Sequence, residues 1–548
     1  MTTSQAFYAQ SGKWLDRIME ESPVLATQMG EHRYDTKLGD HSLQAQERLM
    51  AVVRGMQDDL ADMDTAAWDN DAKIDHTLLT QIFKSLVRGY DKQRTHRRNP
   101  GEVLDTVTGG VMFLIMKEFA PLPERLACAL ARAREIPQVL ADGRKNLILK
   151  EVPRVWAETA LETAQTTPML FTALLPAMAQ QATPESAEEW SEVGQRAAEA
   201  IQSYAEFLRD EVLPVASGSF AVGTDLFNEI LREDHMVDYD ADRLLETGWA
   251  QLRLTRKLME DVAREIDPSK TVRELLEEAK ADHPSAEGLL QAYRDAMQAA
   301  KQFVIDREIA SIPEQESLRI VETPVYLRPI IPYAAYMPAG ILEDAQEGIF
   351  VVTPVDADAP ADEQEEKLKG HFHIKLPVTA LHEAYPGHHL QLTWSNRNEA
   401  LPRRMGSFLA TLFIEGWAFY CEELMEELGF ISEPVQRLGR LSDQLWRAAR
   451  IILDVSLHTR GMTVDEAVDF LVNECQLERS NAVAEVRRYT MTPTQPQSYL
   501  MGKLQILDLI DDLKKTRPEA TLREIHDAIL KAGSLPPRLM RRALLGSG

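Results

Sequence analysis

The chain has 548 residues, 44% of them hydrophobic, and a formal net charge of -26 at pH 7. This apolar share allows a large core, but the acidic balance opposes nonspecific binding to nucleic acid or to anionic membranes. No apolar run reaches the ~20 residues of a membrane span, and three widely separated cysteines argue against a disulfide framework. The first residues lack the basic and apolar regions of a signal peptide, so we expect cytoplasmic residence. The oligomeric state stays open.

Most of the chain has the periodicity of amphipathic helices. Apolar residues three and four apart predict helices over 6–20, 43–63, 74–90, 123–141, 186–213 and 241–266. Thr271 and Thr463, each with a glutamate three residues later, predict helix starts with capping boxes.

The composition changes near residue 315. Segments 319–338 and 348–354 are rich in Val, Ile, Tyr and Pro and predict strands and turns. The acidic segment 356–366 is typical of a surface loop. We predict a mainly α protein with two lobes around a cleft, a helical lobe (1–315) and a catalytic lobe (316–548). The second lobe has a small β-sheet beside a metal-binding helix; one continuous domain is the alternative.

Segment 382–389 reads His-Glu-Ala-Tyr-Pro-Gly-His-His, a zinc-hydrolase helix motif lengthened by two residues. In an H-E-x-x-H helix, two histidines four residues apart share one face and bind the metal. Here Pro386 takes the fourth position, and a straight helix would place His382 and His388 about 240° apart. A second histidine can join His382 only if the helix breaks, which the Pro-Gly dipeptide favours. These residues alone leave His388 and His389 open as the second ligand.

A third ligand is expected, because catalytic zinc usually has three protein ligands and one open position. Segment 409–420 is almost entirely apolar and contains one charge, Glu415. Buried carboxylates are rare unless they are paired or bind metal. Glu422 follows seven residues later on the same helical face, where it can hold a ligand histidine. The alternative is that Glu415 faces solvent at a helix bend beside Gly416.

These motifs resemble a known family. The runs at 382–391 and 415–418, Glu-Gly-Trp-Ala in the second case, and a closing motif at 485–502 are similar to the bacterial "domain of unknown function 885" family. That family is grouped with the gluzincin zinc metallopeptidases, so the resemblance implies a gluzincin-like fold. The ligands that it implies are His382, His388 and Glu415. The chain departs from the family pattern at Pro496, in the loop that carries Tyr499.

A second polar group lies further along the chain. Arg450, Asp454 and His458 recur every four residues and form one stripe on an otherwise apolar helix. The stripe is either a structural ion network or a catalytic element. In the second case His458 or Arg450 holds a substrate oxygen or a terminal carboxylate. Tyr499 is either an oxyanion donor or a packed aromatic residue. Further candidates for substrate binding or ligand support are His389, Arg488 and Lys503.

The leading hypothesis is a zinc-dependent hydrolase that cleaves peptide (amide) bonds. In it, Glu383 is the general base that takes a proton from the attacking water. Zn²⁺ is the expected cofactor, although a site of two nitrogens and one oxygen also accepts other divalent first-row ions. Two alternatives remain. One is hydrolysis of a non-peptide amide or ester, and the other is a helical scaffold protein with a degenerate site.

Overall fold

A computed structural model describes residues 3–323, 328, 331 and 333–546. They are mainly helical and include one small three-stranded sheet, as the sequence predicts. Within this part of the chain, no helix has the length and apolar character needed to cross a membrane. Contacts between Cα atoms group the chain into two compact units. The first comprises Met1–Trp68, Phe83–Val222 and Gly340–Glu343, and the second comprises Asp69–Ile82, Gly223–Ala339 and Asp344–Gly548. The lobes 1–315 and 316–548 stay a prediction.

The first unit is built from helices that bury one face. In α3, for example, Met50, Val53, Met56 and Leu60 recur at helical spacing and are buried. The helices are α1 (Ser4–Glu21), α2 (Pro23–Met29), α3 (Leu43–Ala61), α5 (Thr95–Arg98), α6 (Glu102–Met116), α7 (Leu122–Asn146), α8 (Arg154–Thr166), α9 (Leu175–Ala182) and α10 (Ala187–Phe207). Single 3-10 or π turns occupy Gly89–Gln93, Leu149–Glu151, Leu170–Leu174, Pro184–Ser186 and Leu208–Val212. Helix α4 (Asn70–Arg88) crosses the division between the units.

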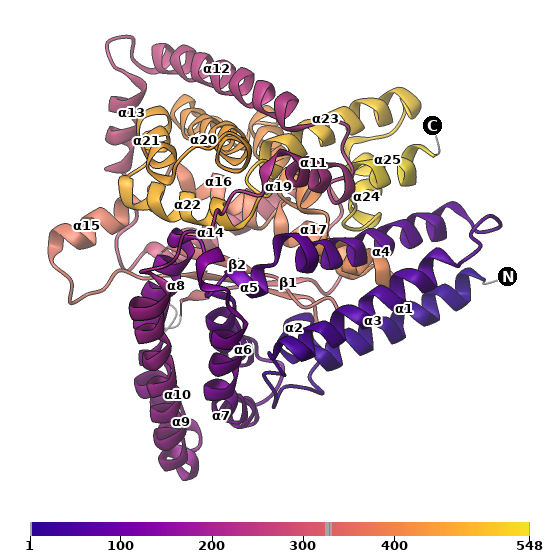
Figure 1. Ribbon diagram of the computed structural model, residues 1–548. Helices are drawn as coiled ribbons and strands as arrows, with labels where there is room; N and C mark the ends of the chain where they lie inside the picture. The colour runs from indigo at the N-terminus through magenta and orange to yellow at the C-terminus, as the bar shows by residue number, and fades with distance from the viewer. Residues whose placement is uncertain (1–2, 324–327, 329–330, 332, 547–548) are drawn as a thin grey trace. The chain divides into compact units, whose positions relative to one another are not determined.

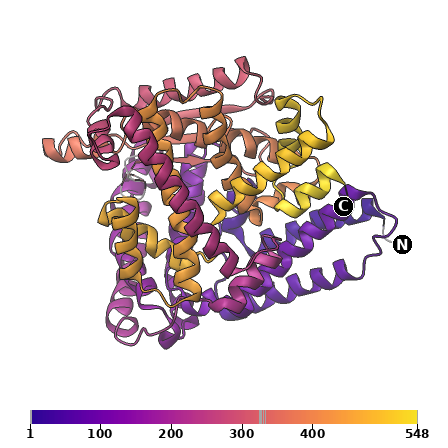
Figure 2. The same cartoon turned by 90° about the horizontal axis from the view of Figure 1, so that it is seen from above.

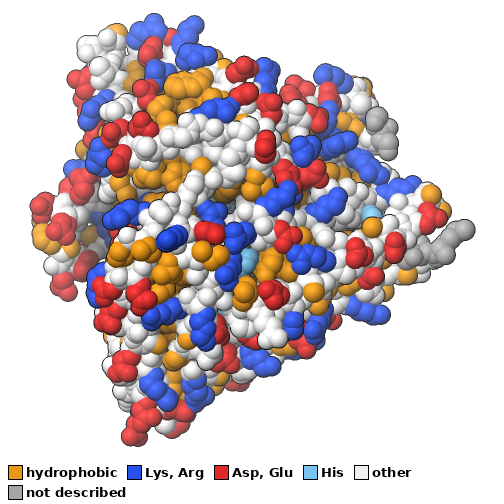
Figure 3. Space-filling view, in the orientation of Figure 1, with side chains coloured by type: hydrophobic (Ala, Val, Ile, Leu, Met, Phe, Trp, Pro, Cys, Tyr) orange, Lys and Arg blue, Asp and Glu red, His pale blue; other side chains and the backbone are white. Residues whose placement is uncertain are grey.

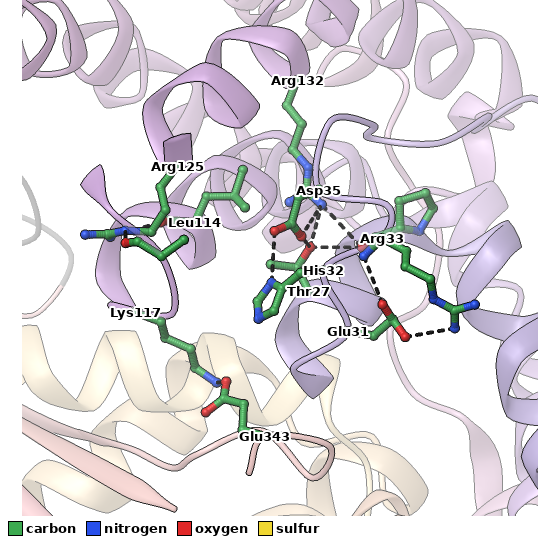
Figure 4. A network of polar contacts seen from close by, with 12 residues as sticks. Thr27, Glu31, His32, Arg33, Asp35, Leu114, Lys117, Arg125, Arg132 and Glu343 are labelled. Carbon is green, nitrogen blue, oxygen red and sulfur yellow. Dashed lines mark hydrogen bonds and ion pairs between the residues drawn. The ribbon is translucent and has the colours of Figure 1, made fainter. Parts of the chain in front are cut away.

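A polar network stabilises the first unit (Figure 4). The guanidinium of Arg132 on α7 is fully buried and donates to the hydroxyl of Thr27 at 2.6 Å. That hydroxyl donates to Asp35 at 2.6 Å, so a buried charge is neutralised through a short chain of hydrogen bonds. In the same view Lys117 pairs with Glu343 at 2.9 Å. This pair fixes the segment Gly340–Glu343 to the unit.

The second unit holds the sheet and the remaining helices. They are α11 (Gly223–Glu233), α12 (Ala241–Ile266), α13 (Val272–Lys280), α14 (Leu289–Asp306), α15 (Ala361–Lys369), α16 (Lys375–Glu383), α17 (His388–Asn396), α18 (Leu401–Met405), α19 (Thr411–Glu427), α20 (Pro434–Thr459), α21 (Val464–Cys475), α22 (Arg479–Met491), α23 (Ser498–Thr516), α24 (Leu522–Lys531) and α25 (Pro537–Leu545), with a 3-10 turn at Gly406–Phe408. Helix α12 lies along α20, and α19 lies along α23 (Figure 1). The yellow C-terminal helices α23 to α25 pack on one another (Figure 2).

The sheet has the strand order β1-β3-β2, with β1 (Ser317–Glu322), β2 (Ala334–Met337) and β3 (Glu347–Val352). Strand β3 is central and pairs parallel with β1 and antiparallel with β2. It packs closely on α17, because a Cβ on Gly348 would lie 2.5 Å from Nδ1 of His389. The sheet therefore adjoins the helix that begins at His388. Residues 324–327, 329–330 and 332 of the predicted strand segment 319–338 lie outside the described residues.

Local sequence signals are mostly confirmed. Both predicted capping boxes are present, at Thr271 and at Thr463. The predicted loop 356–366 is wrong in its second half, because α15 begins at Ala361 directly after Pro360. Proline tolerates a helix start, and Asp362 and Glu363 favour the first turn through the helix dipole. On the face drawn in Figure 3, acidic and basic side chains are interspersed.

Candidate metal centre

The helix carrying the histidine motif breaks at the Pro-Gly dipeptide. Helix α16 ends at Glu383 and α17 begins at His388. Gly387 fits the break because its backbone touches the preceding turn, and a Cβ there would lie 1.8 Å from the carbonyl oxygen of His382. The indole of Trp417 on α19 donates to the carbonyl of Pro386 at 2.8 Å, which holds the break against that helix. Specific packing at Gly387 and the hydrogen bond from Trp417 thus stabilise the break between α16 and α17.

The break brings His382 and His388 together with Glu415 of α19. One donor atom from each of these residues lies within 4.8 Å of the others. The two imidazole rings are nearly perpendicular, with centroids 4.8 Å apart. Nε2 of His388 lies 3.4 Å from Oε2 of Glu415. This distance is long for a hydrogen bond, so these two atoms are close together but remain available to bind a metal ion.

The ionised carboxylate of Glu415 beside two imidazoles favours binding of a cation. Burial raises the pKa of Glu415, but His388 and His382 outweigh burial and hold its pKa at about 2. Glu415 is therefore ionised although it is only partly exposed. Its Oε2 and Nδ1 of His388 have no hydrogen-bond partner among the described residues. An orphaned carboxylate oxygen beside two imidazoles matches the donor set of a divalent first-row ion.

Glu422 is the residue predicted to support a ligand histidine. It is buried and lies seven residues after Glu415 on the same face of α19. Its Oε1 lies 2.8 Å from Nδ1 of His382. A carboxylate at Nδ1 fixes the ring orientation and leaves Nε2 of His382 available to a metal.

Tyr499 on α23 lies beside the same group, and its side chain helps to lower the pKa of Glu415. The approach depends on two glycines, because a Cβ on Gly416 would lie 2.5 Å from the Cα of Gly502. Helices α19 and α23 touch backbone to backbone at this point. Gly416 therefore serves helix packing, and the alternative of a solvent-facing bend does not hold since α19 is continuous.

Glu383 directly follows His382 and is half-buried. Its carboxylate acts electrostatically on two tyrosine hydroxyls. Burial raises the pKa of Tyr293 and of Tyr336, and the carboxylate of Glu383 raises both further. Glu383 also acts electrostatically on His388. The general-base candidate thus belongs to the same cluster as the three donors.

His389 is not in the donor group. It is fully buried, with Nε2 at 2.6 Å from Glu316 and Nδ1 at 3.1 Å from the hydroxyl of Tyr336. Tyr385 donates to Glu316 at 2.8 Å, and Lys301 pairs with it. Burial raises the pKa of Glu316, but these partners outweigh burial and hold its pKa at about 2. Sequence reasoning missed Glu316, because a lone glutamate before a strand has no motif around it.

The polar stripe on α20 divides into separate contacts. Nε2 of His458 lies 2.9 Å from the carbonyl oxygen of Tyr489, and burial lowers its pKa to about 4. Asp454 is fully buried and accepts from the backbone N–H of Thr494 at 3.0 Å. Burial raises the pKa of Asp454 well above its usual range. These contacts to backbone groups favour the structural alternative for both residues.

Arg450 lies closer to the donor group, because its guanidinium carbon is 4.5 Å from the ring centroid of Tyr499. It bonds the hydroxyl of Tyr489 and shares the carboxylate of Glu485 with Arg488. Lys503 is buried and pairs with the carboxylate of a glutamate on α19. This pairing favours a structural role for Lys503.

Comparisons with known proteins give a family and a fold. The family model described as "Bacterial protein of unknown function (DUF885)" matches residues 23–544. "A putative lipoprotein of unknown function from Shewanella oneidensis" is 24% identical over 98% of this chain and 99% of its own, with a TM-score of 0.80. "The putative lipoprotein from Colwellia psychrerythraea" is 18% identical over 100% and 99%, with a TM-score of 0.84. At these identities the likeness shows the fold alone. No curated protein matches the chain.

Proposed function

The chain belongs to the DUF885 family of bacterial proteins of unknown function, and we propose that it is a zinc-dependent hydrolase that cleaves peptide bonds. One observation carries the proposal. The donor atoms of His382, His388 and Glu415 lie within 4.8 Å of one another, and Glu383 follows His382 directly. This arrangement of two histidines, a glutamate and an adjacent carboxylate is what metal-assisted hydrolysis requires.

The residues divide the chemistry among them. His382, held by Glu422, would bind the ion with His388 and Glu415. A bound divalent ion supplies a Lewis acid that polarises the carbonyl group and acidifies water. Glu383 accepts the proton of the attacking water and returns it to the leaving amine. The hydroxyl of Tyr499 donates to the oxygen that becomes negative.

This geometry disfavours the scaffold alternative but leaves other substrates and other metal ions open. A Pro-Gly interruption of the histidine motif would suit a scaffold protein with a degenerate site, but here the interruption brings the two histidines together. Non-peptide amides and esters need the same donor set, so they remain alternative substrates. Other divalent first-row ions remain alternative cofactors. The absence of nucleic-acid and membrane partners stays a prediction.

Location is a separate question. Cytoplasmic residence stays a prediction from the first residues of the chain. The two solved structures named above are described as putative lipoproteins, and this description supports a place in the cell envelope instead. Fractionation of the producing cells, with detection of this chain in each fraction, decides between the two.

Metal analysis joined to a substrate screen tests the function. Protein purified without chelator should carry about one zinc ion per chain, and His382→Ala should carry much less. His526→Gln is the control, since His526 is also buried but bonds Tyr420 and the carbonyl of Ile309.

The screen compares dipeptides, blocked peptides, acyl-amides and esters with metal-loaded and metal-stripped protein. Metal-dependent hydrolysis of peptides supports the proposal. Hydrolysis confined to esters or acyl-amides changes the proposed substrate class. A chain that binds no zinc and gains no thermal stability from added zinc refutes the proposal.

A further inference from the structure

Arg450 is a buried cation with unused hydrogen-bonding capacity. It is 4% exposed, and its Nε and Nη2 bond Tyr489 at 2.9 Å and Glu485 at 3.0 Å. Its Nη1 is buried and has no partner among the described residues. A charged N–H group without a partner is costly in a protein interior. Such a group is expected where an absent anion completes the site.

Two carboxylates in this region are each shared by two cations. Glu485 accepts from both Arg450 and Arg488 through the same oxygen, at 3.0 and 2.8 Å. Asp443 is likewise shared by Lys375 at 2.7 Å and Arg447 at 3.3 Å. Two carboxylates thus serve four cations, which we call the arginine cluster: Lys375, Arg447, Arg450 and Arg488.

Tyr499 connects the arginine cluster to the candidate metal centre. The guanidinium carbons of Arg450 and Arg447 lie 4.5 and 5.6 Å from its ring centroid. Its side chain also lies near Glu415, because each of these two groups shifts the pKa of the other. An anion bound at Arg450 would therefore lie one side chain away from the metal ligands.

A cavity adjoins the arginine cluster. It has a volume of about 430 Å³. Trp446 lines it together with three lysines (Lys280, Lys369 and Lys375) and five carboxylates (Glu277, Glu366, Asp443, Glu478 and Glu485). Trp446 lines the cavity and also packs on the guanidinium of Arg450, with 4.3 Å between ring centroid and guanidinium carbon. A cavity of this size accommodates a short peptide segment.

We propose that Arg450 binds a carboxylate group of the substrate, so that the enzyme selects peptides by a negative charge near the bond that it cleaves. This inference rests on the proposed function and specifies its substrate class. The planar guanidinium matches a carboxylate in shape and charge. A competing explanation is that the cations only balance Glu383, Glu415 and Glu422.

The test compares matched peptides with wild-type protein, Arg450→Lys and Arg440→Lys. The peptides differ in one group: a free carboxyl terminus, an amidated terminus, or an amidated terminus with an acidic side chain. Arg440 is the matched control, because it is 4% exposed on the same helix and pairs with Glu426 and Gln444. Arg450→Lys keeps the positive charge, which protects the fold, but it loses the planar guanidinium group that matches a carboxylate.

We expect wild type and Arg440→Lys to prefer the carboxylate peptides by about 10- to 100-fold in kcat/KM. In Arg450→Lys this preference should fall to about threefold or less. The two carboxylate peptides separate a terminal from a side-chain source. A wild-type enzyme indifferent to the carboxylate, or a preference that survives in Arg450→Lys, overturns the inference while peptide hydrolysis itself stands.

Failure of all hydrolysis is a different outcome and removes the proposed function. The carboxylate site then has its own readout, which is calorimetric binding of an N-acetyl amino acid compared with its amide. Binding of the acid alone, lost in Arg450→Lys but kept in Arg440→Lys, retains the site. Equal binding of acid and amide, or none, overturns it.

Discussion

A Cβ on Gly387 would lie 1.8 Å from the carbonyl oxygen of His382. No side chain fits at this contact, and the neighbouring atoms are backbone, which cannot rotate away. The contact closes the break between α16 and α17, and this break brings His388 to His382. The candidate metal centre therefore depends on a glycine that is not one of its donors.

Gly387→Ala is predicted to damage fold and metal binding together. The backbone must shift to admit the methyl group, so the free energy of unfolding should fall by about 3 kcal/mol. Zinc content should fall with it. Urea unfolding and metal analysis measure the two effects. Gly55→Ala on α3 is the control, since nothing lies within 4 Å of a Cβ there; a variant at 387 that behaves like it contradicts the argument.

Glu422→Gln should weaken metal binding without removing a ligand. The carboxylate lies 2.8 Å from Nδ1 of His382, and the loss of such a partner typically costs about 10- to 100-fold in metal affinity. Competition with a chelator of known affinity measures the change. Glu426→Gln is the control on the same helix, because Glu426 pairs with Arg437 and Arg440 and should leave metal affinity unchanged.

Glu383→Gln should keep the metal and lose turnover. The amide has nearly the shape of the carboxylate but cannot accept the proton of water, and general-base catalysis contributes about 100- to 10,000-fold. Zinc content near the wild-type value together with a kcat lower by such a factor is the expected pair of results. Equal turnover in the variant would assign the proton transfer to another group.

Tyr499→Phe distinguishes two roles of one hydroxyl. If it donates to the developing oxyanion, kcat should fall about 100-fold with little change in zinc affinity. If it only holds Glu415, zinc affinity should fall while turnover per bound zinc ion stays constant. We expect the first result, and parallel measurement of kcat and of zinc affinity separates them.

The sequence predicts the elements of this fold better than their arrangement. Helical periodicity and the capping boxes at Thr271 and Thr463 are local, and both appear in the structure. Helix α15 was missed because its acidic composition resembles a surface loop. The division of the chain into compact units depends on contacts between distant segments, as with Gly340–Glu343 in the first unit, and periodicity does not encode such contacts.

At the site, the sequence identifies chemistry but not position. A lone charge in an apolar helix singles out Glu415, and the spacing to Glu422 selects its neighbour. The stripe of Arg450, Asp454 and His458 is present on α20, yet its members face different partners. Glu316 has no local signal, because only the packing of the sheet on α17 brings it to His389.

Glu316→Gln should show how far this buried network supports the fold. The carboxylate binds Lys301, Tyr385 and His389, so its neutral replacement should cost about 2 kcal/mol of unfolding free energy at pH 7. The folded-state pKa of Glu316, about 2, lies below its ordinary value of 4.5. A lowered pKa contributes stability above the ordinary value and loses it as pH falls toward the folded value. The difference between wild type and variant should therefore be constant above about pH 5 and shrink between pH 4.5 and 2. Urea unfolding of both proteins across this range measures it, and a difference that grows on acidification contradicts the assignment.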